Sequence, residues 1–299
     1  MKILELIEGL APGGAQRFVV DLCNEMSKNH EVCLFTFRNG KDYNFYLKDV
    51  SNRVNRIIYS GSNGKLSKCF QAFVVLWNIW KYKPDIVHVH NIAFIYSILP
   101  ALLLRKTKFY YTVHNVADKD AGYGIGGKLR KKLLKKLIRP VTISKYCDRS
   151  FLEFYGYSSF GIIENGCREI SLTKDFAAVN DEIERYKPTV NTKVFINIAR
   201  LDEQKNHELL ISAFNDFVDK GYDGILLIIG STRNINHIEY LKNLVKDRSR
   251  IIFLGLKENV ADYLANADFF CLSSTWEGLP ITILEAGLSG CYLISTPVG

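Results

Sequence analysis

The stretch ADFFCLSSTWEGLPITILEAG, residues 267–287, contains one complete strand-turn-helix unit. Residues 267–274 form a short apolar run that is typical of a buried strand. Pro280 suits the first position of a helix, so Gly278 and Leu279 are expected to present backbone amides at a helix amino terminus. Such a terminus attracts anions through its unpaired N–H groups and its dipole. The stretch therefore predicts a parallel β-sheet with an anion site at its edge.

Strand-like and helix-like runs alternate along the whole chain. Short apolar strands separated by helices predict βαβ units and buried parallel sheets. We predict an α/β fold of two Rossmann-like domains, 1–170 and 171–299, that face a central cleft and are joined by a polar linker at 168–191. The strand-like runs are 2–7, 31–37, 85–90, 108–114, 140–144, 160–164, 193–199, 224–230, 250–255, 267–274 and 291–295, and the helix-like runs include 15–28, 92–104, 127–138, 204–220, 235–247 and 280–288.

Composition and charge limit the classes of function. Hydrophobic residues make up 47% of the 299 residues and charged residues 23%, as in an ordinary globular protein. The seven cysteines include no C-x-x-C pair, which argues against a disulfide framework or a zinc site and favours a reducing cytoplasm. The longest apolar run, 92–104, is too short to cross a bilayer. Residues 1–180 carry a net charge of +12 and residues 181–299 a net charge of −4, so the first half is expected to meet an anionic partner.

Glycine-rich segments raise the question of a dinucleotide site. GYGIGG, residues 122–127, has the G-x-G-x-x-G spacing but follows no strand. The second strand ends without an acidic residue for a ribose, which argues against a nicotinamide-dependent oxidoreductase. After the first strand, GLAPGGAQ (9–16) places Gly13 and Gly14 where the backbone can approach an anion at the start of a helix. A tight strand-to-helix turn is the alternative interpretation of these two glycines.

Charged residues follow the strands of the second half. Arg200 and Lys205 come directly after the strand 193–199, and both residue types bind phosphate oxygens. Glu277 precedes a helix and can reach sugar hydroxyls, while Glu285 lies inside that helix and can accept two hydrogen bonds from a ribose diol. Taken singly, these residues fit solvated loop charges or acids that complement a helix dipole. Together they predict a diphosphate site beside hydroxyl-bearing groups.

The chain resembles the retaining glycosyltransferases of family 4, which have the GT-B fold. The segment from Glu277 to Glu285 is similar to the E-x7-E motif of that family, and ARLDEQKN (199–206) is similar to its phosphate-binding segment. PDIVHVHN, ISKY, IIENG and GGAQR also match in order and spacing, so the resemblance covers the whole chain. Members of the family usually continue for several dozen residues, so we expect the C-terminal domain to be truncated at its end.

The resemblance implies an activity. The chain would transfer a sugar, without a metal or cofactor and with retained anomeric configuration, from a nucleoside diphosphate sugar to a glycan or lipid-linked acceptor in surface polysaccharide synthesis. A UDP-sugar is favoured over a GDP-sugar as the donor. Two alternatives stay open, namely a truncated non-catalytic nucleotide-sugar-binding protein and another GT-B enzyme such as a sugar-nucleotide epimerase.

The same resemblance assigns roles to individual residues. Arg200 and Lys205 would neutralise the leaving diphosphate, Glu277 would contact the transferred sugar, Glu285 would bind the ribose, and His114 would contact the donor sugar near the reaction centre. Catalytic roles thus fall to His114, Glu277, Arg200 and Lys205, and donor binding to Gly14, Arg200, Lys205, Glu277, Gly278, Leu279 and Glu285.

Two histidines invite comparison with a metal site. His88 and His90 alternate along the strand 85–90 and could face one side of the sheet. No third ligand stands near them in the sequence, so no metal site is expected.

A strongly basic segment, KLRKKLLKKLIR (128–139), carries seven cations and no acid. Its apolar residues Leu129, Leu133, Leu134, Leu137 and Ile138 form a stripe that is expected to pack on the sheet. No helix-turn-helix or aromatic stacking surface accompanies the charge, so no nucleic-acid partner is expected. Because cations attract anionic lipid, we predict a cytoplasmic protein bound peripherally to the inner membrane face through Lys128, Arg130, Lys131, Lys132, Lys135, Lys136 and Arg139.

Overall fold

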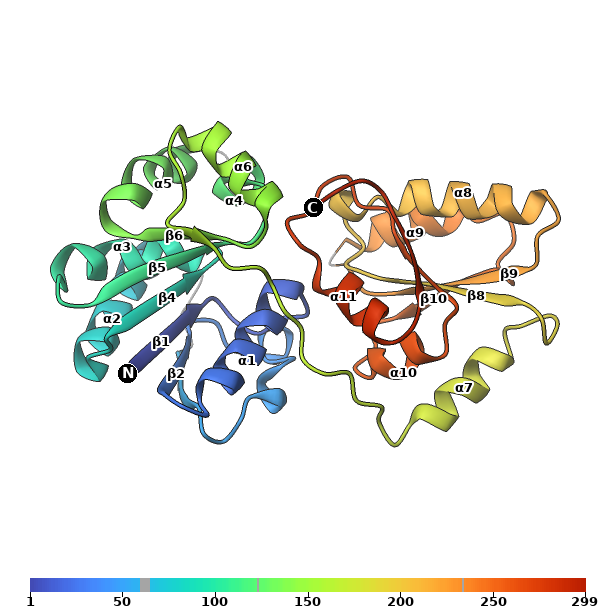
Figure 1. Cartoon of the computed structure of the whole chain (residues 1–299), viewed down its shortest axis with the longest axis horizontal. Helices are drawn as coiled ribbons and strands as arrows, with labels where there is room; N and C mark the ends of the chain where they lie inside the picture. Colours follow the sequence, from blue (N-terminus) through green and yellow to red (C-terminus); the bar gives the residue numbers. More distant parts are fainter. Residues whose placement is uncertain (60–64, 123, 233) are drawn as a thin grey trace. The chain divides into compact units, whose positions relative to one another are not determined.

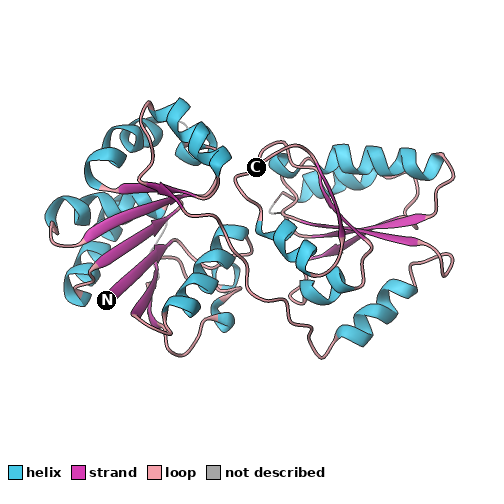
Figure 2. Cartoon of the chain, viewed as in Figure 1, coloured by secondary structure: helices cyan, strands magenta, loops and turns pink. Residues whose placement is uncertain are grey.

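The computed structural model describes residues 1–59, 65–122, 124–232 and 234–299, with the side chains of 65–69, 124–129 and 135 outside the description. The described residues form two compact units, Met1–Gly166 and Cys167–Val298 (Figure 1). The division falls between Gly166 and Cys167, whereas the sequence placed it after residue 170. In each unit helices cover both faces of a parallel sheet (Figure 2).

The sheet of the first unit has seven parallel strands in the order β3-β2-β1-β4-β5-β6-β7. Strands β1, β4 and β5 are direct neighbours, and their register sets Glu5 opposite His88 and His90 opposite Thr112. The strands are β1 (Lys2–Ile7), β2 (Glu31–Thr36), β3 (Asn55–Ile58), β4 (Ile86–His90), β5 (Lys108–Val113), β6 (Arg139–Thr142) and β7 (Gly161–Ile162).

Helices cover the two faces of this sheet unequally. Helices α2, α3, α5 and α6 share one core with Leu4 and Leu6 of β1, while α1 covers the other face together with Ile7. Because strand side chains alternate, Glu5 lies on the α1 face. The helices are α1 (Gly14–Met26), α2 (Lys65–Tyr82), α3 (Ala93–Leu103), α4 (Ala117–Ala121), α5 (Gly124–Leu137) and α6 (Lys145–Tyr155), with short 3-10 turns η1 (Lys41–Tyr43) and η2 (Leu47–Asp49).

The second unit contains a five-stranded parallel sheet in the order β10-β9-β8-β11-β12. One core holds residues of α7, α10 and α11, and the other holds residues of α8 and α9, so helices again cover both faces. The elements are β8 (Lys193–Ile198), β9 (Gly224–Ile229), β10 (Ile251–Gly255), β11 (Phe269–Leu272), β12 (Tyr292–Ser295), α7 (Phe176–Glu184), η3 (Glu203–Lys205), α8 (His207–Asp219), α9 (Ile235–Asn243), α10 (Val260–Ala265) and α11 (Ile281–Leu288).

The prediction of a linker over 168–191 is wrong for the middle of that stretch. Residues Phe176–Glu184 form α7, which packs Val179 and Ile183 into the core of the second unit. These two side chains are four positions apart and therefore lie on one face of a helix. The helix was not predicted because it is short and most residues of 168–191 are polar.

The basic helix α5 confirms one expectation and corrects another. Leu134 and Ile138 are buried in the core, as the predicted apolar stripe requires. Arg130, however, is buried as well, and its guanidinium lies 3.0 Å from Asp120 Oδ2 and 2.9 Å from the Tyr111 hydroxyl. Arg130 is four positions before Leu134, so it faces the core and takes no part in a membrane surface.

The other predicted membrane-binding residues divide into two groups. Lys131, Lys132, Lys136 and Arg139 are exposed, although Arg139 begins β6 and is not part of the helix. The side chains of Lys128 and Lys135 fall outside the described part of the chain. Among the helices that the structure describes, none has both the length and the apolar character needed to cross a membrane.

Candidate functional site

Two neighbouring strands of the second unit end in loops that contact each other. Strand β8 leads through Arg200 to η3, and β11 leads through residues 273–280 to α11. Because β8 and β11 pair in parallel, their carboxyl ends meet at the same edge of the sheet. The Thr275 amide donates to the Gln204 carbonyl at 2.8 Å, and the Gln204 side chain donates to the Trp276 carbonyl at 2.9 Å. These bonds hold the two loops together.

Lys205 and Glu277 form an ion pair where these loops meet. Lys205 Nζ lies 2.5 Å from Glu277 Oε1, and only 15% and 7% of the two side chains are exposed. Ser274 Oγ donates to the same carboxylate oxygen at 2.6 Å, and Gln204 Nε2 lies 3.3 Å from the other. We call these four residues the Lys205–Glu277 cluster. It brings together two predicted site residues that are 72 positions apart in the chain.

Arg200 and Glu285 lie outside this cluster. The Arg200 side chain is 57% exposed and pairs with Asp202 at 3.1 Å. Glu285 lies in the second turn of α11 and is half-buried. The structure thus joins Lys205 to Glu277 but, among the contacts between described residues, does not join Arg200 to them.

The start of α11 differs from the prediction by one residue. The helix begins at Ile281, and Pro280 precedes it with an extended ψ of 124°. A helical residue needs a ψ near about −42°, so Pro280 is the residue before the helix and not its first member. The first-turn amides consequently belong to residues from Ile281 onward, while Gly278 and Leu279 lie in the loop that leads to them.

Gly230 at the end of β9 has a role that sequence reasoning missed. A Cβ at Gly230 would lie 1.8 Å from the Ala199 carbonyl oxygen, and its φ of +156° is one that other residues rarely adopt. The Gly230 amide also donates to the Gly255 carbonyl at 2.9 Å. Only glycine therefore allows the chain to leave β8 along the path that positions Arg200. The signal was available, because a lone glycine ending a strand suggests close backbone approach.

In the first unit, His114 belongs to a chain of buried polar groups. His114 Nε2 lies 2.9 Å from His90 Nδ1, and His90 Nε2 lies 2.7 Å from a carboxylate oxygen of Glu5. His88 Nδ1 also contacts the Glu5 carboxylate, at 3.1 Å, and its Nε2 lies 2.7 Å from Thr112 Oγ1. Glu5 and His90 are fully buried, whereas His114 is partly exposed. Sequence reasoning considered the two β4 histidines but missed Glu5.

Burial and neighbouring charges shift the pKa values in this cluster. Burial raises the pKa of Glu5, but attraction and hydrogen bonds from His88 and His90 outweigh it and lower the pKa to about 2. Burial, aided by repulsion from His88, lowers the pKa of His90 to about 4. Burial and the nearby His90 and His88 hold the pKa of His114 well below its usual value. His90 and His114 are therefore neutral at pH 7.

We expect the first unit to lose stability as the pH falls below 6.5. The unfolded chain protonates His90 near its ordinary pKa of 6.5, whereas the folded chain does so only near about 4. The contribution of His90 to the free energy of unfolding is therefore fully present above pH 6.5 and declines as the pH falls toward 4. At pH 5 the loss from His90 alone is about 2 kcal/mol. Urea unfolding at pH 7.5 and 5.0 measures the loss when it is followed by tryptophan fluorescence in a Trp276→Phe background, which leaves Trp77 and Trp80 of the first unit as reporters. A His90→Phe variant with the same pH dependence as the parent chain would contradict the assignment.

The expectation that no third ligand stands near His88 and His90 is wrong. Glu5 supplies one from β1, and one ligand atom from each of the three residues lies within 4.8 Å of the others. Two histidines and a carboxylate are a donor set that suits several transition metals. In this structure the same atoms are hydrogen-bonded directly to one another, which satisfies them without an ion.

Gly14 is the first residue of α1 and follows the loop after β1. A Cβ at Gly14 would have no atom within 4 Å among the described residues, and its φ is not positive. The fold itself therefore does not require a glycine at this position.

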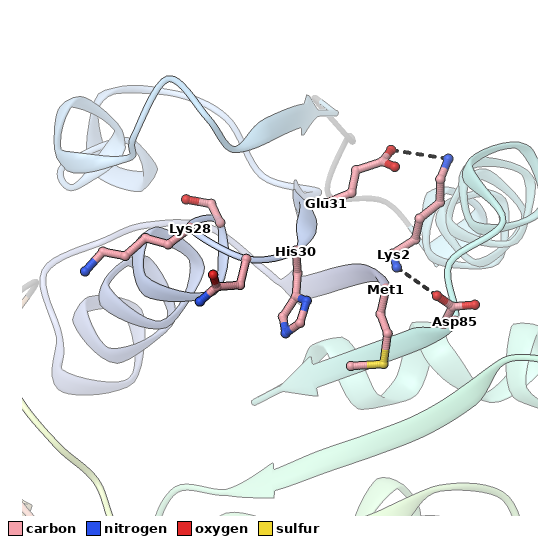
Figure 3. A pocket seen from close by; sticks show the side chains of 8 residues that line it. Met1, Lys2, Lys28, His30, Glu31 and Asp85 are labelled. Carbon is pink, nitrogen blue, oxygen red and sulfur yellow. Dashed lines mark hydrogen bonds and ion pairs between the residues drawn. The ribbon is translucent and has the colours of Figure 1, made fainter.

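A separate surface hollow lies at the amino ends of β1 and β2 (Figure 3). Three of its residues contact one another: Lys2 Nζ lies 3.2 Å from Glu31, and the Lys2 amide donates to Asp85 at 2.8 Å. The predicted site residues follow the carboxyl ends of the strands, where ligands of open α/β sheets bind. Within the first unit, the hollow thus lies at the opposite end of the strands from Gly14 and His114.

Comparison with families of known proteins gives two matches. Residues 12–168 match the family described as Glycosyltransferase Family 4. Residues 179–299 match the family described as Glycosyl transferases group 1, and this segment contains the Lys205–Glu277 cluster.

Individual proteins agree with these matches. An uncharacterised glycosyltransferase of Methanocaldococcus jannaschii is 28% identical over 242 residues, which are 76% of this chain and 59% of that protein. A Campylobacter jejuni N-acetylgalactosaminyltransferase that acts on an undecaprenyl-diphosphate-linked glycan is 26% identical, over 96% of this chain and 76% of that enzyme. The solved structure of Anabaena HepE with UDP and glucose covers the whole chain and 81% of HepE, with a TM-score of 0.83 and 17% identity.

Proposed function

Because the chain belongs to Glycosyltransferase Family 4 and has the GT-B fold, we propose that it transfers a sugar from a nucleoside diphosphate sugar to a glycan or lipid-linked acceptor in surface polysaccharide synthesis. The observation that carries this proposal is the Lys205–Glu277 cluster, which sets an ammonium and a carboxylate at adjoining strand ends. The name of the C. jejuni relative supports a lipid-linked acceptor, and a second HepE structure, solved with UDP-glucose, supports a UDP-sugar.

In this proposal the second unit stabilises the departing diphosphate. Lys205 and the exposed Arg200 neutralise the charge that develops on the leaving group. Such electrostatic stabilisation is usually the largest single contribution of an enzyme to the rate. The Lys205 ammonium has three N–H groups. It can therefore donate to a phosphate oxygen while it keeps its hydrogen bond to Glu277. Glu277 then accepts hydrogen bonds from the transferred sugar, and Glu285 accepts those of the ribose.

Further contacts complete the proposed donor site. The loop amides of Gly278 and Leu279 bind the diphosphate, and the backbone at Gly14 also takes part in donor binding. His114 contacts the donor sugar. The anomeric configuration is retained, no metal ion takes part, and UDP is preferred to GDP.

An assay of the purified chain tests the function. UDP-sugars and GDP-sugars are offered with and without an undecaprenyl-diphosphate-linked glycan, and released nucleoside diphosphate and glycan product are measured. We expect release that depends on the acceptor, is faster with UDP-sugars and is unchanged by EDTA. Affinity for the donor without release would identify a binding protein, and an isomerised nucleotide sugar formed without acceptor would identify an epimerase.

Gly14→Ala is expected to weaken donor use without harming the fold. The new methyl group has no atom of the described residues within 4 Å, and alanine in a helix is more stable than glycine by up to about 1 kcal/mol. If the backbone at Gly14 approaches the diphosphate, the methyl group intrudes there and raises the KM for the donor roughly tenfold or more. Gly161→Ala is the matched control, because a Cβ there is also unobstructed. Unchanged kinetics in both variants would remove Gly14 from the donor site.

A membrane surface is the second proposed partner. Four aromatic residues of α2 are 52–60% exposed: Phe70, Phe73, Trp77 and Trp80. Their spacing of three, four and three positions places them on one helix face, which we call the α2 aromatic stripe. The buried Val75 and Ile79 hold the opposite face of α2 to the sheet.

Charge beside the α2 aromatic stripe favours a lipid surface over a protein partner. Helices α2, α3 and α5 cover the same face of the sheet and contain no acidic residue. Exposed cations border them, namely Lys81 on α2, Arg105 and Lys106 after α3, and Lys131, Lys132 and Lys136 on α5. Aromatic rings and cations together bind the interface of an anionic bilayer. We infer that this face docks on the inner membrane leaflet and gives the enzyme a peripheral, cytoplasmic location.

A further inference from the structure

The hydrogen-bond chain in the first unit has a fixed direction. It crosses three neighbouring strands, from Glu5 on β1 to His90 on β4 and to His114 directly after β5. Phe18 of α1 packs edge-on against both rings, with centroids 6.3 Å from His90 and 5.6 Å from His114. The hydrogen-bond chain therefore runs from the fully buried Glu5 carboxylate to the partly exposed His114 imidazole. Packing against Phe18 holds both imidazole rings in place.

Only one placement of the imidazole hydrogens is compatible with the hydrogen bonds from Glu5 through His90 to His114. An ionised carboxylate can only accept, so His90 Nε2 must carry the hydrogen that it donates to Glu5. In a neutral imidazole the other nitrogen is then an acceptor, so His90 Nδ1 accepts from His114 Nε2–H. The remaining nitrogen of His114, Nδ1, keeps its lone pair. It has no hydrogen-bond partner among the residues that the structure describes.

We propose that Glu5 and His90 are positioning residues, which hold His114 as the Nε2-protonated tautomer and so present Nδ1 as the acceptor for a hydroxyl of the donor sugar. This inference rests on the proposed function, because it takes the donor sugar as the group that His114 meets. A sugar hydroxyl would donate to Nδ1, and every hydrogen bond from there to Glu5 would point the same way. Aligned hydrogen bonds polarise one another, so the buried charge strengthens the acceptor at the far end.

A metal ion in the same cluster would reverse this direction. If an ion bound Glu5, His88 Nδ1 and His90 Nε2, then His90 would carry its hydrogen on Nδ1 and donate to His114, as metal-bound histidines donate to outer groups. His114 would then be protonated on Nδ1 and could not accept there. The tautomer of His114 thus distinguishes the hydrogen-bonded cluster from a metal site.

Nitrogen-15 NMR of the whole chain, without substrate, reads this tautomer directly. The chain has only six histidines, so single His→Gln variants assign the ring signals. We expect a hydrogen on His114 Nε2, none on Nδ1, and a coupling across the hydrogen bond to His90 Nδ1. A hydrogen on His114 Nδ1, or about one equivalent of metal in the purified protein, would overturn the proposal.

Two variants connect the tautomer to catalysis. His90→Phe removes the acceptor for His114 Nε2–H, so we expect both tautomers of His114 and a roughly tenfold lower kcat/KM for the donor. Thr112→Val is the matched control, because it removes the partner of His88 in the same cluster without touching the chain to His114. It should leave the His114 signals and the kinetics near those of the parent.

The outcomes separate this inference from the proposed function. If the protein transfers sugar but His114 has the other tautomer, the inference is wrong and the proposed function stands. If His114 has the expected tautomer but the protein transfers no sugar, the proposed function is wrong. Should His90→Phe not fold, the spectrum of the parent chain still decides the tautomer.

Discussion

Lys205→Ala is expected to lower the rate of sugar transfer by roughly 10²–10³-fold, which corresponds to about 2–4 kcal/mol of lost transition-state stabilisation. The ammonium lies in a largely buried cluster, 2.5 Å from Glu277, where solvent screens it little. Steady-state kinetics with the best donor of the assay above measure the loss. Lys205→Arg keeps the charge and should recover part of the rate. Near-normal turnover of the alanine variant would remove Lys205 from the mechanism.

Stability must be separated from catalysis in this experiment. Removing Lys205 leaves the Glu277 carboxylate buried, with Ser274 and Gln204 as its remaining side-chain donors among the described residues, which destabilises the loops. The double variant Lys205→Met/Glu277→Gln removes both charges and should fold as well as the parent while remaining inactive. Arg200→Ala should lower the rate by a similar factor at no cost in stability, because Arg200 is exposed and its ion pair among the described residues is the exposed one with Asp202.

Trp77→Ser/Trp80→Ser is expected to weaken binding to anionic vesicles roughly a hundredfold or more, since burying each large side chain contributes about 1.5–3 kcal/mol. The two rings are adjacent in the α2 aromatic stripe, with centroids 5.1 Å apart. Sedimentation with vesicles of phosphatidylglycerol and phosphatidylcholine measures the loss, and neutral vesicles show how much depends on charge.

A matched control is available in the second unit. Tyr222 is 59% exposed, so Tyr222→Ser removes a similar aromatic surface far along the chain and should leave vesicle binding unchanged. Lys131→Gln/Lys132→Gln/Lys136→Gln should weaken binding mainly at low salt, because screening removes that attraction. A parent chain that does not bind anionic vesicles, or a double Trp variant that binds as the parent does, would contradict the membrane proposal.

Features that depend on short stretches could be predicted from the sequence. The alternation of strands and helices, the positions of Lys205 and Glu277 beside strand ends and the packing of Leu134 and Ile138 all follow from local periodicity and from the geometry of parallel sheets. The helix α2 shows the limit of this reasoning. Ten of the twelve residues 69–80 are apolar, so periodicity could not show that Val75 and Ile79 face the core while Trp77 is exposed.

By itself, then, the sequence determined the class of fold, the family and the edge of the second sheet at which a diphosphate site is expected. Only the tertiary structure decided which polar and charged groups meet: Lys205 with Glu277, Arg130 with Asp120, and His90 with both Glu5 and His114. The physical reason is that such partners come from different strands and helices. Their contact depends on the order and register of the strands and on the rotation of each helix, which no single segment of the sequence contains.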